Sequence, residues 1–240
     1  MKAYVEYGLD FDNNRFGFGK STEIENDDGT EYRIKTNISI YNKCYYVRLW
    51  IGKKVFSYSV HDGFKIKTKK RNNFKLILGV AGYVPSINLI CGFMGFGKTT
   101  YAKKLEAEIS AIRFTHDEIM FHRYGRTPKD FTSKYKKVDA DIKQQAIQTI
   151  KAGKNVILDY GFWSKKDRKE YYDWAKSVTP NVFFHVLDCD ISVAKERILL
   201  RTKNNMEELF IDENCFNDRL KLFEPYQSQE GYPKVVYCKT

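Results

Sequence analysis

The sequence predicts an α/β protein, in which a doubly wound parallel sheet is preceded by a small all-β domain. From Ser86 onward, short apolar runs alternate with segments of helical spacing, which is typical of a parallel sheet covered by helices on both faces. Residues 1–84 instead show runs of β-forming residues separated by turn residues. The first apolar run after Ser86 leads directly into a glycine-rich turn. We therefore expect two domains, residues 1–84 and 85–240.

The bulk composition is that of a folded protein without membrane spans. A chain of 240 residues with 42% hydrophobic residues can bury a substantial core. No run approaches the roughly 18 apolar residues of a membrane helix, and Met1–Glu6 lacks the apolar region of a secretory signal. The five cysteines are scattered and form no C-x-x-C pair, so neither a disulfide framework nor a zinc site is indicated. We expect a cytoplasmic protein with no membrane partner.

The first domain is predicted to be a β-sandwich or barrel, because its β-forming runs are short and closely spaced. The predicted strands are Ala3–Tyr7, Tyr32–Ile40, Cys44–Ile51, Lys54–Val60, Phe64–Lys67 and Phe74–Leu78. Breaks are expected at residues 51–54 and 71–73. The glycine-rich stretch Gly79–Pro85 is predicted to be the linker to the second domain.

Positive charge is the second notable property of the first domain. The whole chain has a net charge of +11, and Lys65–Arg71 forms a basic cluster among many aromatic residues. Basic grooves with stacked aromatic side chains bind single-stranded nucleic acid. The simpler interpretation, which we favour, is that the aromatic residues fill a small core and the cluster caps a hairpin. Nucleic acid stays an alternative partner of this domain.

The second domain opens with the most informative motif of the chain. Residues 92–99 match the phosphate-binding pattern G-x-x-x-x-G-K-[ST] at every fixed position. The apolar run Ile87–Cys91 before it is predicted to be a strand, and Thr99–Ile109 after it a helix. The residues expected to contact phosphates are Gly92, Phe93, Met94, Gly95, Phe96, Gly97, Lys98, Thr99 and Thr100. In this motif, Lys98 reaches the outer phosphates and the Thr99 hydroxyl holds Mg²⁺.

A similar ending, Gly19-Lys20-Ser21, lies in the first domain but lacks the motif's first glycine. No apolar run precedes it, so it is interpreted as a turn. The other strands predicted for the second domain are Ala111–Thr115, Asn155–Asp159, Val182–Asp188 and Val235–Cys238.

Two carboxylates follow strands of this predicted sheet. Asp117 comes just after Ala111–Thr115, where a strand end faces the ligand crevice, and can act as general base toward an attacking hydroxyl. The alternative is that Asp117 or Glu118 only caps the next helix. Asp159 ends the apolar run that begins at Asn155, and it can bind Mg²⁺ through water or orient the substrate hydroxyl. Ser164 to Asp167 resembles a capping box and is interpreted as structural.

Arginines supply the remaining candidates. Arg197 and Arg201 are four residues apart, so they share one helix face, and arginines aimed at a transferring phosphoryl group accelerate its transfer. Their alternative role is a solvated basic face. Arg123 and Arg126 are weaker candidates for contact with an anion. The four histidines lack the spacing of a metal site and are interpreted as packing or surface residues.

In order and spacing, these motifs resemble the small P-loop kinases of the AAA-type ATP-binding group, which are relatives of polynucleotide 5′-hydroxyl kinases, chloramphenicol phosphotransferase and zeta toxins. The resemblance covers residues 86–230 and rests on residues 92–100, 117–120, 124–126, 156–164, Arg168, 196–201 and 223–225. It implies a P-loop kinase-like fold, ATP and Mg²⁺, with Asp117 as base, Asp159 near the substrate, and Arg197 and Arg201 in or beside a lid. Polynucleotide kinases of this group tend to carry arginine three residues after the base, where this chain has Met120.

We therefore expect an ATP-dependent kinase that transfers the γ-phosphate to a hydroxyl of a small or nucleotide-like acceptor, which the sequence does not identify. One alternative is a polynucleotide 5′-hydroxyl kinase whose β domain binds the nucleic acid. Another is a nucleotide-gated binding module with little turnover.

Overall fold

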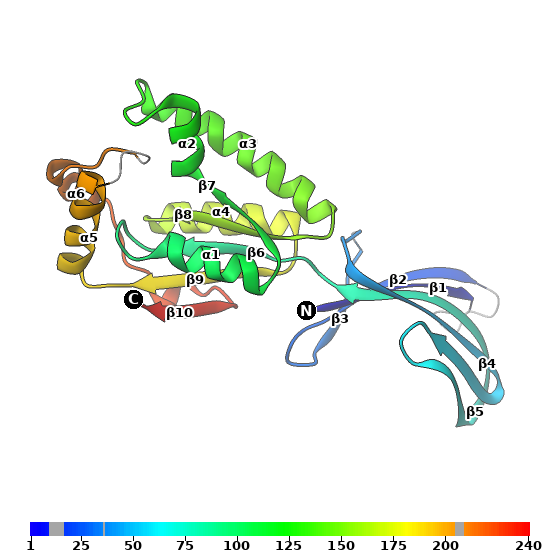
Figure 1. The fold of residues 1–240 in the computed structure, drawn as a ribbon. Helices are drawn as coiled ribbons and strands as arrows, with labels where there is room; N and C mark the ends of the chain where they lie inside the picture. Colours follow the sequence, from blue (N-terminus) through cyan, green and yellow to red (C-terminus); the bar gives the residue numbers. More distant parts are fainter. Residues whose placement is uncertain (10–16, 36, 205–208) are drawn as a thin grey trace. The chain divides into compact units, whose positions relative to one another are not determined.

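The described residues form two five-stranded sheets, one in each of the units Met1–Pro85 and Ser86–Thr240 (Figure 1). The computed structural model describes residues 1–9, 17–35, 37–204 and 209–240. Over these ranges, no helix combines the length and apolar character needed to cross a bilayer. The fold class predicted from the sequence, a parallel sheet with helices preceded by a β region, is confirmed.

The first unit is a single antiparallel sheet with strand order β3-β2-β1-β5-β4. Its strands are β1 (Lys2–Leu9), β2 (Phe18–Glu25), β3 (Glu31–Arg33), β4 (Tyr41–Ser59) and β5 (Gly63–Tyr83). β4 and β5 form a long hairpin with an irregularity in register between Gly52 and Lys54. A small cluster of buried side chains lies on one face of the sheet.

Several details of this unit differ from the sequence prediction. One open sheet forms instead of a sandwich or barrel. The breaks expected at residues 51–54 and 71–73 lie within β4 and β5, because cross-strand pairing outweighs local turn preference. Residues 79–83 of the predicted linker extend β5, and the predicted turn at residues 19–21 belongs to β2. Of the strand predicted at Tyr32–Ile40, β3 contains only the first two residues, and residue 36 lies outside the described residues.

The second unit is a parallel sheet with strand order β10-β9-β6-β8-β7. Its strands are β6 (Ile87–Cys91), β7 (Ala111–Thr115), β8 (Asn155–Gly161), β9 (Val182–Asp188) and β10 (Val235–Lys239), close to the predicted bounds. Later strands are added on both sides of β6, since β8 pairs with one edge of β6 and β9 with the other. This is the doubly wound arrangement, in which ligands bind at the carboxyl ends of the strands.

Helices cover both faces of this sheet (Figure 1). The helices are α1 (Lys98–Glu108), α2 (His116–Tyr124), α3 (Phe131–Lys151), α4 (Lys165–Val178), α5 (Ile191–Asn204) and α6 (Glu213–Leu220), with a 3₁₀ turn η1 (Ser228–Glu230). One buried cluster joins α2, α3 and α4 to Leu89 and Leu158. The other joins α1, α5 and α6 to Ile90 and Ile157. Adjacent residues of β6 and β8 therefore point to opposite layers.

Candidate functional site

The glycine-rich turn between β6 and α1 has the backbone shape expected of a phosphate-binding loop. Gly92, Gly95 and Gly97 all have positive φ angles, of 152°, 80° and 74°. A Cβ atom on Gly95 would lie 2.3 Å from the backbone oxygen of Ala194 in α5. Glycine is therefore required here both by conformation and by the close approach of another chain segment.

The loop ends at the N-terminus of α1, where backbone N–H groups face outward. Gly97 is the N-cap, and no side chain caps the helix. Uncapped N–H groups and the helix dipole make such a terminus suited to a phosphate group. The Lys98 ammonium donates a hydrogen bond to the Phe93 carbonyl at 2.8 Å. Burial lowers the pKa of Lys98, while the carboxylates of Asp159 and Asp117 act in the opposite direction.

Asp159 lies in the middle of the site. It pairs in register with Ile90 of β6 and Thr115 of β7, so it stands between the glycine-rich loop and the start of α2. Its side chain is only 1% exposed. Burial is the largest influence on the pKa of Asp159 and raises it. The neighbouring Lys98, Thr99 and Arg113 act in the opposite direction without reversing the shift.

The surroundings of Asp159 fit a bound cation. Neither carboxylate oxygen accepts a hydrogen bond among the residues that the structure describes, although the Arg113 guanidinium lies 3.5 Å from one of them. Buried carboxylate oxygens without partners are costly unless an ion or water satisfies them. Among the same residues, no three His, Cys, Asp or Glu side chains gather into a metal site. Mg²⁺ is commonly held by one or two protein oxygens plus phosphates and water, so Asp159 and Thr99 suit it.

Asp117 lies in the first turn of α2 and is exposed. It is not the N-cap, which is Thr115, and no side chain accepts a capping hydrogen bond at this helix end. The Asp117 carboxylate is close enough to Asp159 and Tyr135 to raise the pKa of both. The structure therefore brings Asp117, Asp159 and Lys98 together at one edge of the sheet.

Arg113 belongs to this site, although the sequence analysis did not select it. Its guanidinium lies 3.5 Å from the Asp159 carboxylate and donates two hydrogen bonds of 3.0 Å to Glu118. It also contacts the hydroxyl of Thr115. The signal in the sequence was a single charged residue inside an otherwise apolar strand, which required a partner.

The two arginines of α5 approach the loop from the other side. Arg197 donates to the Gly95 carbonyl at 3.4 Å and lies 3.4 Å from the Cys189 sulfur. The charge of Arg201 contributes to lowering the pKa of Lys98, so Arg201 also lies near the phosphate-binding loop. Residues 205–208, which follow α5, lie outside the described residues, so the lid expected in or beside these arginines stays a prediction.

Arg123 and Arg126, the weaker candidates for anion contact, have other partners. Arg123 forms an ion pair with Asp141 at 2.5 Å. Arg126 donates to the Thr202 carbonyl at 2.7 Å and stacks over Phe210. Their contacts join α2 to α3 and the α2–α3 connection to α5.

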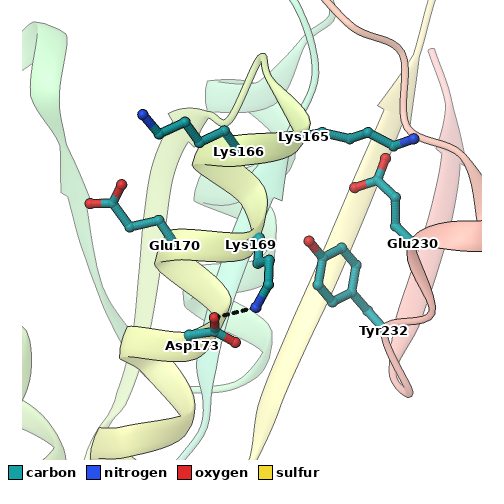
Figure 2. Close-up of a pocket in the computed structure, with 7 residues that line it drawn as sticks. All are labelled: Lys165, Lys166, Lys169, Glu170, Asp173, Glu230 and Tyr232. Carbon is teal, nitrogen blue, oxygen red and sulfur yellow. Dashed lines mark hydrogen bonds and ion pairs between the residues drawn. The ribbon is translucent and has the colours of Figure 1, made fainter.

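A cavity of 610 Å³ lies along α4, apart from the residues discussed so far (Figure 2). It is lined by Lys165, Lys166, Lys169, Glu170, Asp173, Glu230 and Tyr232. Figure 2 shows Lys169 joined to Asp173 across one turn of the helix, at 2.6 Å. None of the predicted phosphate or base residues lines this cavity.

Comparison with known families identifies the family of the second unit. A family model described as an AAA domain matches residues 87–226, which is more than half of the chain. The chain belongs to this AAA-domain family. The AAA domain has the P-loop kinase type of fold, so the resemblance inferred from the motifs is confirmed. A second model, described as a protein of unknown function (DUF3977), matches residues 2–82.

Solved structures agree on the fold of the AAA domain. A "putative kinase" from Chloroflexus aurantiacus has a TM-score of 0.52 at 15% identity, over 66% of this chain and 89% of that chain. Kti12 of Chaetomium thermophilum, solved with ADP-AlF3, has a TM-score of 0.50 at 16% identity, over 64% of this chain and 88% of that chain. A comparison with curated proteins gave no match.

Proposed function

We propose that this protein is an ATP-dependent kinase that transfers the γ-phosphate to a hydroxyl group. The observation that carries the proposal is the grouping of Asp117, Asp159 and Lys98 beside a glycine-rich loop that ends at an uncapped helix. A site that only binds a nucleotide does not need an exposed carboxylate such as Asp117 next to the phosphates. A kinase does, because the acceptor hydroxyl loses its proton.

Each residue of the site has a role in this proposal. Lys98 and the loop amides bind the phosphates of ATP. Thr99 and Asp159 would hold Mg²⁺, which neutralises phosphate charge when it is bound. Asp117 accepts the proton from the acceptor oxygen, and that oxygen forms the new bond to the γ-phosphorus as the bond to ADP breaks. Arg197 and Arg201 contact the phosphoryl group from the α5 side.

The neighbourhood of Asp117 favours a hydroxyl acceptor that carries no phosphate of its own. Met120, three residues after Asp117, is fully buried against α3 and cannot contact an acceptor. Arg113 is engaged with carboxylates, and Arg123 with Asp141. A phosphorylated acceptor would need a cation that these residues use elsewhere. We place the reaction in the cytoplasm, without a membrane partner.

The test is a transfer assay with γ-labelled ATP and fractionated cell extract. Asp117→Asn should lower the rate of label transfer by about 10²–10⁴-fold, which is the usual contribution of a general base. Its affinity for ADP should stay near that of the parent protein. Asp218→Asn, the same change at an exposed residue of α6, is the control. Transfer at the parent rate by Asp117→Asn would remove Asp117 as the base, and ATP binding without any labelled acceptor would favour a nucleotide-gated module.

A polynucleotide 5′-hydroxyl kinase is the second candidate, because β5 of the first unit is strongly basic. Lys65, Lys67, Lys69, Lys70 and Arg71 of β5 are all exposed. Two lysines also flank an aromatic ring, with Lys69 and Lys75 lying 5.7 and 5.8 Å from the Trp50 ring centre. This candidate predicts binding of single-stranded RNA or DNA that weakens steeply as salt rises, because phosphate contacts release counterions. Binding that is absent or independent of salt would eliminate it.

A further inference from the structure

The first unit is a sheet with a single layer. None of the helices that the structure describes lies within Met1–Pro85, and its described strands form one sheet. Folded domains bury the apolar face of a sheet against a second layer. Among the described residues of this unit, no second layer covers the sheet.

One face of the sheet is apolar, and much of it is open to solvent. In the register of the sheet, four successive residue pairs between β4 and β5 lie on this face, namely Tyr45–Val80, Val47–Leu78, Leu49–Leu76 and Ile51–Phe74. The same face carries Val5, Tyr7 and Leu9 of β1 and Phe18 of β2. We call these twelve residues the apolar face. Up to the irregularity between Gly52 and Lys54, Lys20, opposite Tyr7, is the charged side chain that the described register adds to it.

The opposite face already has partners. It carries the buried cluster of Tyr46, Trp50 and Ile77. Its polar groups are also joined, since the Tyr46 hydroxyl donates to Glu6 at 2.5 Å. On the face with Val5 and Tyr7, Ala3, Thr22 and Ile24 are buried at one end of the sheet, and the exposed apolar side chains lie farther along the strands.

The exposed apolar surface is large. Seven residues of the apolar face are between 37% and 73% exposed, namely Tyr7, Phe18, Tyr45, Val47, Ile51, Phe74 and Leu78. An aromatic side chain buries about 150–250 Å² when it is fully covered. The seven residues together leave roughly 600–700 Å² to cover, close to the ~800 Å² that each partner contributes to a standard interface.

We propose that a second copy of this chain covers the apolar face, so that two sheets pack face to face as a sandwich across a twofold axis. Such an interface brings the same patch of both copies together, and a patch with almost no charge meets its own copy without repulsion. Nucleic acid is a poor occupant of this face, because Arg48, Lys75 and most other cations of the sheet lie elsewhere.

Analytical ultracentrifugation of the full chain tests this, with a matched pair of variants in β5. Phe74 and Asn73 are neighbours, both exposed, on opposite faces of the strand. The molar mass measured for the parent protein at micromolar concentration should be twice the chain mass of 28.2 kDa. Phe74→Glu places one carboxylate from each copy in the interface and should raise the dimer dissociation constant about tenfold or more. Asn73→Glu should leave it unchanged.

Thermal unfolding of both variants shows whether the sheet still folds. If Phe74→Glu does not fold, Tyr45→Glu is a second variant on the apolar face. A parent protein that is monomeric at all concentrations would overturn the proposal. That result would also follow if Ser86–Thr240 or another partner covered the apolar face instead. Equal weakening by Phe74→Glu and Asn73→Glu would overturn it as well.

Discussion

At the scale of single residues, two aspartates of the AAA domain differ in environment, although one lies near the end of β8 and the other just after β7. Asp159 is buried beside Lys98, Thr99 and Arg113, and burial raises its pKa. Asp117 is exposed in the first turn of α2. A buried carboxylate suits a fixed ligand role, and an exposed one suits contact with an incoming acceptor. The environment of each aspartate therefore separates two roles that residue type alone does not distinguish.

Asp159→Asn should make nucleotide affinity insensitive to Mg²⁺. In the parent protein, ADP should bind more tightly when Mg²⁺ is present if Asp159 holds the cation as proposed. Loss of a group that holds a metal through water costs about 10–100-fold in metal affinity. Calorimetric titration with ADP, with and without Mg²⁺, measures the difference. Asp218→Asn, at an exposed position of α6, is the control, and an unchanged Mg²⁺ effect in Asp159→Asn would contradict the assignment.

At the scale of elements, short contacts between segments far apart in sequence hold the site in place. The glycine-rich loop touches α5 through Gly95 and Arg197. The Arg168 side chain of α4 is fully buried and pairs with Glu230 of η1 at 2.6 Å. Such a pair is weak evidence of stability, but loss of one partner leaves a buried charge uncompensated. The loop's shape therefore depends on α5, and the start of α4 depends on η1.

Gly95→Ala should destabilise the AAA domain. The new methyl group would meet the Ala194 backbone, and alanine is unfavourable at this positive φ, so the free energy of unfolding should fall by about 2–5 kcal/mol. Gly231→Ala has a similar φ of 73° but no close neighbour, and should cost only the conformational part. Chemical denaturation in a Trp50→Phe background, followed by the fluorescence of Trp163 and Trp174, measures both. Equal losses in the two variants would show that contact with α5 is unimportant.

At the scale of the whole molecule, a buried histidine links the stability of the AAA domain to pH. His185 of β9 is 4% exposed, and its ring nitrogens lie 3.0 Å from the Asn88 side-chain oxygen and 2.8 Å from the Tyr101 hydroxyl. Burial lowers the pKa of His185 from 6.5 to about 4. As pH falls, the unfolded chain takes up this proton before the folded chain does. The stabilising contribution is present above pH 6.5 and is lost as pH falls toward 4.

This group should account for about 3 kcal/mol of lost stability between pH 6.5 and pH 4. His185→Gln keeps a polar side chain without a titration in this range. Its free energy of unfolding should therefore fall less over that interval than that of the parent protein. Denaturation curves across the interval, in the Trp50→Phe background, give both slopes. Parallel slopes would mean that His185 does not control the acid sensitivity.

The sequence by itself determined the class of the AAA domain and most of its strands. Apolar runs predicted β6, β7 and β9 with the bounds that the structure has, and the glycines of residues 92–97 predicted the turn between β6 and α1. These features depend on neighbours along the chain, so periodicity and backbone preference are sufficient to predict them. The carboxylates at the ends of β7 and β8 could be selected for the same reason.

Only the tertiary structure decided what depends on distant pairing. Arg113 became part of the site through contact with Asp159, which is 46 positions away along the printed sequence. The first unit became one open sheet because β4 and β5 pair across residues whose local preference is a turn. Whether its apolar strand residues face a core or solvent is decided by which layers exist, and local periodicity contains no information on that.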